Sequence, residues 1–286
     1  MDESQGNSDK MQPRCVDDTF AQFTSFGTAY LRAIESMRSD RIVNDPFAGR
    51  LTRQKRVDLE KFFLTTSKPS SLWGDFIAIR TRYLDEALEH RDGNIRQIVI
   101  LGAGLDTRAF RLDSLHGCHI FEIDQSGQAF ERMDQVMKEE NVPLIAKKAD
   151  YIVANLADDD WDSKLLAHGF DPSSPTFWIM EGLLPYMKRS CILTCWTHSM
   201  ATFNFGDTAV TMKYSDDDPL HGVLSKIPWC LRLQASLKNG GIHFGRKWTP
   251  LISQDTNKTV SITFIMGKKP VSSEARLKDV CPGLDY

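Results

Sequence analysis

Two glycines stand where a buried strand could present them to a bound molecule. The apolar run Gln97–Leu101 ends at Gly102, and Gly104 follows one residue later. A continuous apolar run that ends in glycine is typical of a strand buried on both faces of a parallel sheet. Glycines just after such a strand allow a tight turn and let backbone N–H groups approach a ligand. This stretch therefore predicts the start of a ligand site.

An acid closes the next apolar run, His119–Asp124. Asp124 follows Gly104 by 20 residues. At that distance a carboxylate at a strand end can accept hydrogen bonds from ribose hydroxyls. The order strand, glycine turn, helix, strand and acid therefore predicts an α/β fold that binds a nucleoside-containing cofactor.

The turn itself discriminates between two cofactors. A dinucleotide fingerprint has a third glycine where this chain has Thr107. Asp106 would repel the pyrophosphate of NAD, whereas S-adenosylmethionine (SAM) has no pyrophosphate and carries a sulfonium. We therefore favour SAM. An NAD site is the alternative, and a plain strand and turn without a ligand is the simplest structural interpretation.

Two further apolar runs also end in residues that could contact a ligand. The run Lys148–Ala154 is followed by Asn155 and Leu156, and the run Thr176–Met180 is followed by Glu181. Ligands of open α/β sheets bind at the carboxyl ends of the strands. We therefore expect one rim to gather the following residues: Gly102, Gly104, Asp124, Asn155, Leu156 and Glu181.

An arginine falls on the apolar face of a helix that is expected from Ser70 or Ser71 to about His90. Arg80 shares this face with Ile77 and Leu84. An arginine that faces a core needs an anion, because its desolvation otherwise costs several kcal/mol. An internal salt bridge and a ligand carboxylate are equally consistent partners.

The chain divides into three parts. We expect residues 1–17 to be disordered, and residues 18–286 to form one domain. Within it, residues 18–92 form a helical cap and residues 95–286 form the α/β core, with later insertions that cover the substrate. The later elements are expected as a helix at 188–204, a fifth strand at 208–214, a poorly patterned segment at 224–237 and an edge strand at 260–266.

Composition excludes several partners. The net charge of −3 and the pI near 6.2 give no indication of nucleic acid or an anionic membrane. No apolar run approaches the roughly 20 residues that span a bilayer. Cys191, Cys195 and His198 have a metal-like spacing, but buried thiols on a helix explain it better, so no metal is expected. Unpaired cysteines and a polar N-terminus unlike a signal peptide favour the cytoplasm.

The motifs together resemble those of one family. The segments LGAGLDTRAFRL at 101–112, FEIDQ at 121–125 and EGLLPY at 181–186 resemble the leucine carboxyl methyltransferase family. That family includes bacterial SAM-dependent methyltransferases and polyketide O-methyltransferases. NDPFA at 44–48 and IRTRY at 79–83 look like its N-terminal motifs. The resemblance covers roughly Phe20 to Met200 and is looser in the last third.

The resemblance implies a class I SAM-dependent methyltransferase fold, which is a Rossmann-like, seven-stranded mixed sheet with an N-terminal helical cap. It also implies a role for each matched position. Arg80 would bind the SAM carboxylate, Gly102 the methionine portion, Asp124 the ribose, Asn155 and Leu156 the adenine, and Glu181 the methionine amino end or the approach to the acceptor. Gly104 is also expected to bind the cofactor. The family commonly has Asp where this chain has Asn155, and an amide oxygen still accepts a hydrogen bond.

The expected activity is O-methylation of a carboxyl or hydroxyl group on a small molecule or a protein C-terminus. Methyl transfer is an in-line displacement at the sulfonium carbon, so the protein mainly aligns the reactants and excludes water. A carboxylate needs no base, whereas a hydroxyl benefits from one. Glu181 and Tyr186 are the candidates near the acceptor, and the other possible bases are His198, His221 and His243. A catalytically silent SAM-binding regulatory protein and an NAD-dependent oxidoreductase are the rival functions, and the oligomeric state is not predicted.

Overall fold

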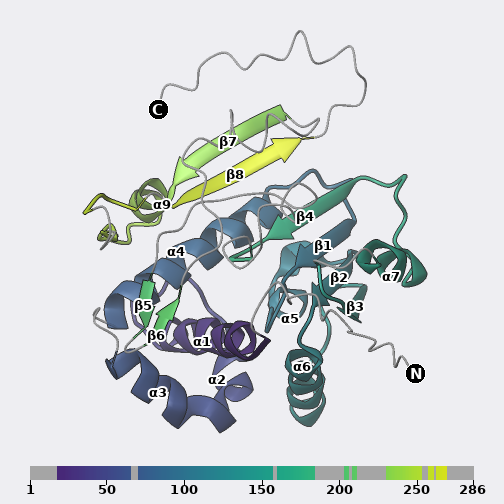
Figure 1. The fold of residues 1–286 in the computed structure, drawn as a ribbon. Helices are drawn as coiled ribbons and strands as arrows, with labels where there is room; N and C mark the ends of the chain where they lie inside the picture. The colour runs from purple at the N-terminus through teal and green to yellow at the C-terminus, as the bar shows by residue number, and fades with distance from the viewer. Residues whose placement is uncertain are drawn as a thin grey trace, which may run out of the picture.

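The computed structural model describes four long parts of the chain, 18–65, 70–156, 160–183 and 230–252 (Figure 1). It also describes the short segments 203–205, 208–210, 257–260 and 262–268. Within these residues, no helix has both the length and the apolar content that crossing a membrane would require.

The central element is a parallel sheet of four strands. These are β1 (Gln97–Leu101), β2 (His119–Asp124), β3 (Lys148–Val153) and β4 (Thr176–Met180), in the order β3-β2-β1-β4. All five residues of β1 are buried, as the unbroken apolar run predicts. The chain adds β2 and β3 on one side of β1 and then β4 on the other side. The strand order therefore reverses beside β1, and such a switch point is where open α/β sheets bind ligands.

Both faces of this sheet are covered. Val99 and Leu101 pack into one buried cluster with Phe121, while Ile98 and Ile100 pack into a second cluster on the other face. Short helices follow the strands: α5 (Arg108–Arg111), η2 (Asp113–Leu115), α6 (Gly127–Glu139) and α7 (Trp161–Ala167). The hydroxyl of Ser126 begins α6 by accepting the N–H of Ala129.

The predicted helical cap precedes the sheet. It consists of α1 (Asp18–Ser36), α2 (Ala48–Leu51), η1 (Arg53–Lys55), α3 (Arg56–Thr65) and α4 (Ser70–Glu89). Helix α4 joins the two parts of the fold, because Leu88 packs under the sheet while Ile77 and Ile79 pack in the cap. Figure 1 shows α1 and α4 beside the sheet, with α9 (Leu237–His243) against α4.

The later strands differ from the expectation. β5 (Phe203–Phe205) pairs with β6 (Thr208–Val210), and β7 (Cys230–Ser236) pairs with β8 (Thr263–Lys268), each as a separate antiparallel pair. The described residues therefore contain a sheet of four strands, and the predicted sheet of seven is not shown. The fifth strand was expected beside the parallel sheet, but its first residues pair locally with β5.

One predicted helix end was wrong, while residues 188–202 of the same helix lie outside the described residues. The helix expected at 188–204 overlaps β5, because Gly206-Asp207 between two aromatic or β-branched segments is a signal for a local hairpin. The segment 224–237 that lacked a clear pattern contains β7. The edge strand expected at 260–266 exists as β8, shifted towards the C-terminus.

A buried ion cluster fastens the segment after α9 to the cap. Both terminal nitrogens of Arg246 donate to the carboxylate of Glu35 on α1, at 3.0 and 2.9 Å. Arg246 also donates to Asp75 on α4 at 2.9 Å and to the carbonyl of Asp40 at 2.9 Å. The side chains of Arg246 and Glu35 are only 6% and 2% exposed. This cluster therefore joins α1 and α4 to Arg246, which lies 211 positions after Glu35 and 171 positions after Asp75.

We expect Arg246→Met to lower the free energy of unfolding by roughly 3 kcal/mol, because it leaves the Glu35 carboxylate buried without its main partner. Denaturant titration measures this change. Arg56→Met is the matched control, since Arg56 is 69% exposed in its pair with Glu60 and should cost less than about 1 kcal/mol. Equal costs for the two variants would contradict the structural role of the cluster.

Candidate functional site

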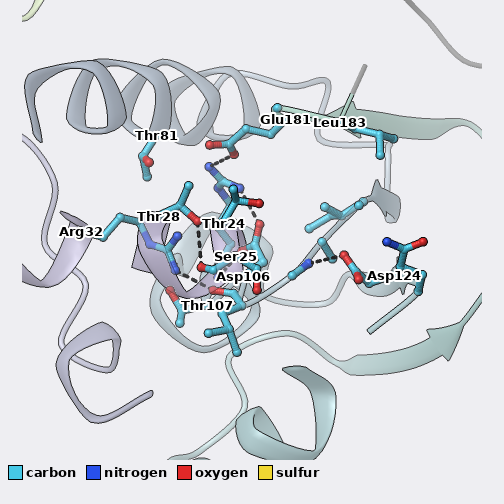
Figure 2. Close-up of a pocket in the computed structure, with 18 of the residues that line it drawn as sticks. Thr24, Ser25, Thr28, Arg32, Thr81, Asp106, Thr107, Asp124, Glu181 and Leu183 are labelled. Carbon is cyan, nitrogen blue, oxygen red and sulfur yellow. Dashed lines mark hydrogen bonds and ion pairs between the residues drawn. The ribbon is translucent and has the colours of Figure 1, made fainter. Parts of the chain in front are cut away.

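One pocket opens at the carboxyl ends of the central strands. Its wall includes all seven residues predicted to contact a cofactor, namely Arg80, Gly102, Gly104, Asp124, Asn155, Leu156 and Glu181. Helix α1 contributes a further wall through Thr24, Ser25, Thr28 and Arg32 (Figure 2). The structure thus brings together residues from α4, from the end of β2 and from the segments that follow β1, β3 and β4, while their roles in binding stay predictions.

The glycine turn after β1 is held by its own backbone. Gly102 and Gly104 have φ values of 68° and 56°, in the left-handed region that favours glycine. The N–H groups of Gly102 and Ala103 donate to the carbonyl of Ile123 at 2.8 and 3.1 Å. The N–H of Gly104 donates to the Asp124 carboxylate at 2.9 Å. These three donors are therefore already engaged by β2 and do not form an open cradle for an anion.

Asp106 occupies the start of α5. Its carboxylate accepts the backbone N–H of Arg108 at 2.8 Å and also contacts the guanidinium of Arg108. A helix start is where a dinucleotide site places its pyrophosphate. Here that position already holds a negative charge, which would repel a second one.

Asp124 is fixed from two sides at the end of β2. One carboxylate oxygen accepts the N–H of Gly104 at 2.9 Å, and the other accepts the N–H of Ser126 at 2.8 Å. Burial raises the pKa of Asp124, although these N–H groups oppose the shift. Because each carboxylate oxygen has more than one acceptor position, Asp124 can also accept hydrogen bonds from a ligand.

Arg80 has the internal partner that its position on α4 required. Its Nε donates to Glu181 at 2.7 Å, and Glu181 also accepts from Arg108 at 2.8 Å. Burial works to raise the pKa of Glu181, but Arg108 and Arg80 outweigh it and hold this pKa well below its usual range. Glu181 is therefore an ionised residue, while Arg80 still lines the pocket.

Gly182 makes room for this arginine. A Cβ at Gly182 would lie 3.0 Å from Nη1 of Arg80, and its φ of 66° is also unfavourable for other residues. Position 182 therefore requires glycine on both steric and conformational grounds.

Arg108 belongs to a larger buried network that the sequence analysis missed. Its Nε donates to Asp85 on α4 at 2.7 Å, and Asp85 also binds Arg111 at 2.7 and 2.9 Å. The network continues from Arg111 through Thr107 to Asp45. It contains four arginines and four carboxylates, so its charges balance: Arg32, Arg80, Arg108 and Arg111 with Asp45, Asp85, Asp106 and Glu181.

One signal could have identified part of this network. Asp85 lies on the same buried face of α4 as Ile77, Thr81 and Leu88. A buried carboxylate needs a cationic partner for the same reason that Arg80 needs an anion, because its desolvation is costly, so Asp85 could have been expected to pair with an arginine or lysine. Asp45 carries a weaker signal, because an acid in an Asn-Asp-Pro turn is usually explained by the turn alone.

The predicted bases are not part of the described pocket. His243 is exposed and lies 3.0 Å from Glu86, and it does not line the pocket. Tyr186, His198 and His221 lie outside the described residues, as do Cys191 and Cys195. Within the described part of the chain, no group of His, Cys, Asp and Glu could hold a metal ion.

Glu122 lies on β2, two residues before Asp124. It is fully buried, and neither carboxylate oxygen has a hydrogen-bond partner among the described residues. The hydroxyl of Tyr151, its register partner on β3, is also buried and unpartnered. Burial, Asp106 and Asp124 raise the pKa of Glu122 well above its ordinary value, and Arg108 opposes them only in part. Glu122 therefore holds its proton more tightly than an exposed glutamate does.

We expect Glu122→Gln to alter how stability depends on pH. A raised pKa means that the folded chain binds this proton more tightly than the unfolded chain. The resulting stability is complete below pH 4.5 and is lost as pH rises through the folded pKa, at up to about 1.4 kcal/mol per pH unit. The glutamine amide cannot titrate, so the stability of the variant relative to the wild type should increase as the pH rises above 4.5. Parallel stability profiles in denaturant titrations would contradict a raised pKa of Glu122.

Comparisons with known proteins identify relatives of the part of the chain that contains most of the lining residues. Residues 25–194 match the family model described as leucine carboxyl methyltransferase. A "Putative S-adenosyl-L-methionine-dependent methyltransferase" of Saccharopolyspora erythraea is 38% identical over 168 residues, which is 57% of this chain and 57% of that protein. A protein of Streptomyces coelicolor with the same description is 39% identical over 179 residues, which is 58% of this chain and 57% of that protein.

The solved structures are more distant. A magnesium protoporphyrin IX methyltransferase from Synechocystis with bound SAM has a TM-score of 0.37 and 10% identity, over 85% of this chain and 97% of that one. In the sequence comparisons, the match spans little more than half the length of the curated relatives.

Proposed function

Because the chain belongs to the leucine carboxyl methyltransferase family, we propose that it binds SAM and transfers the methyl group to an oxygen of its acceptor. The curated relatives carry the same general activity in their descriptions. A cytoplasmic location and an acceptor that is either a small molecule or a protein C-terminal carboxyl stay predictions from the sequence.

The observation that carries this proposal is the closed glycine turn. Its three leading N–H groups donate to β2, and Asp106 holds the start of α5. A pyrophosphate would therefore meet a carboxylate instead of free N–H groups. An adenosyl sulfonium has no such group, and a positive sulfonium is compatible with nearby carboxylates. This geometry supports SAM over NAD.

The roles of the lining residues are part of the proposal. Asp124 would accept from the ribose hydroxyls, and Asn155 and Leu156 would border the adenine. Gly102 and Gly104 would allow the methionine portion to pass close to the backbone, beside Arg80 and Glu181. The finer fold assignment, a class I Rossmann-like sheet of seven strands, is proposed on the strand order β3-β2-β1-β4 and the family membership.

We expect the wild-type chain to bind SAM in isothermal titration calorimetry, with no competition from NAD. Arg80→Ala should weaken binding of S-adenosylhomocysteine by about 10- to 100-fold, because a hydrogen bond to a charged group is lost. The same variant should bind 5′-methylthioadenosine unchanged, because that ligand lacks the amino acid portion. Arg82→Ala is the matched control, since Arg82 is on the same helix and pairs with Glu86 and Glu89. An unchanged affinity for S-adenosylhomocysteine would remove Arg80 from the site.

The described lining also bears on the acceptor. Its titratable residues are four arginines and the acids Asp106, Asp124 and Glu181. Glu181 is paired with Arg80 and Arg108, which hold its pKa well below its usual range, and Asp106 is paired with Arg108. An acceptor that is already an oxyanion, such as a carboxylate, would need no base, whereas an alcohol would benefit from one. We therefore propose a carboxylate acceptor, because the acids Asp106 and Glu181 of the described lining are engaged in ion pairs.

We expect S-adenosylhomocysteine to form faster with carboxylic acids than with alcohols of matched size, and the rate to change little between pH 6 and pH 9. Mass spectrometry of methyl esters and methyl ethers measures both products. A rate that rises steeply with pH, together with ether products, would favour a hydroxyl acceptor and a base. SAM binding without turnover across the panel would support the alternative of a silent SAM-binding protein.

A further inference from the structure

Helix propensity differs along helix α1. The part of α1 up to Thr28, called the first half below, contains Thr24, Ser25, Gly27 and Thr28, which are weak helix formers. The hydroxyls of Ser25 and Thr28 donate back to helix carbonyls at 2.8 and 2.9 Å. Such bonds compete with regular helix geometry and favour bending.

The second half of α1 is firmly anchored. Arg32 is paired with the buried Asp45 at 2.9 Å, and Glu35 is paired with the buried Arg246. These are charged contacts between buried groups, and breaking them is costly. Motion of α1 is therefore expected to concentrate in its first half.

The first half lies against both groups that hold the Asp124 carboxylate. Ser25 is packed on Gly104, because a Cβ added at Gly104 would lie 2.9 Å from the Cβ of Ser25. Gln22 donates from its side-chain amide to the hydroxyl of Ser126 at 3.1 Å, across 104 residues of sequence. Figure 2 shows Thr24, Ser25 and Thr28 projecting from α1 into the pocket. A ribose seated at Asp124 would thus lie beneath this part of α1.

We propose that the Gln22–Ser126 hydrogen bond is a clasp that holds the first half of α1 closed over Asp124, and that release of this clasp admits and frees an adenosyl ligand. The proposal rests on the proposed function for the identity of the ligand. Gln22 is then a positioning residue, because it acts through α1 without contacting the reacting atoms.

A clasp has a kinetic signature that a ligand contact lacks. Opening precedes both entry and exit, so a weaker clasp should raise the association and dissociation rates together. The dissociation constant then stays nearly constant. A lost ligand contact instead raises the dissociation rate alone, and the dissociation constant rises in proportion.

We expect Gln22→Ala to raise both rates for S-adenosylhomocysteine several-fold, with the dissociation constant within about twofold of the wild type. Rapid mixing with labelled ligand gives the association rate, and a dilution chase gives the dissociation rate. Gln128→Ala, on the exposed surface of α6, is the matched control and should leave both rates unchanged. In the double variant with Ser126→Ala, Gln22→Ala should have no further effect on the rates, because the bond is already absent.

Gly27→Ala should act in the opposite direction. The added methyl group makes only ordinary contact with Phe63, at 3.5 Å, and alanine strengthens the helix. Both rates should therefore fall. A change in the dissociation rate alone, or no change with either variant, would overturn the clasp.

Hydrogen exchange separates this proposal from the proposed function. In the ligand-free chain, the amides of residues 24–29 should exchange several-fold faster in Gln22→Ala than in the wild type or Gln128→Ala. If the wild type bound no adenosyl ligand, the proposed function would fail, and unchanged exchange in Gln22→Ala would independently refute the clasp.

Discussion

The position of the cap on the sheet depends on charge compensation around Arg108. A guanidinium this deeply buried is tolerable only when carboxylates surround it, and Asp85, Asp106 and Glu181 do so. These acids come from the cap, from the glycine turn and from the end of β4. The same compensation therefore fixes the cap relative to the sheet, and it sets the position of Arg80 through their shared partner Glu181.

This arrangement also determines what chemistry the pocket can perform. Arg108 and Arg80 hold the pKa of Glu181 well below its usual range, so this acid is a poor proton acceptor. Asp124 differs, because only backbone N–H groups hold it and its pKa is raised by burial. The site thus combines a rigid charged wall with one acceptor of hydrogen bonds at the strand end.

The sequence predicted the parts of the fold that depend on local pattern. The buried run of β1, the acid at the end of β2 and the buried face of α4 each follow from periodicity, and the four parallel strands are confirmed. It did not predict the balanced network, because tertiary packing brings Asp45 to Thr107 across 62 residues and Asp85 to Arg108 across 23 residues. The later strands were misplaced because short aromatic segments paired with their local neighbours instead of the central sheet.

The contact between Arg246 and Glu35 has a consequence for how such a chain can diversify. The last third of the sequence resembles the family only loosely, yet one of its arginines neutralises a buried acid of the first helix. A substitution in this part of the chain that removes or displaces Arg246 would leave the Glu35 carboxylate buried without its main partner. The packing of the first helix therefore depends on one arginine from a part of the chain that lies outside the family match.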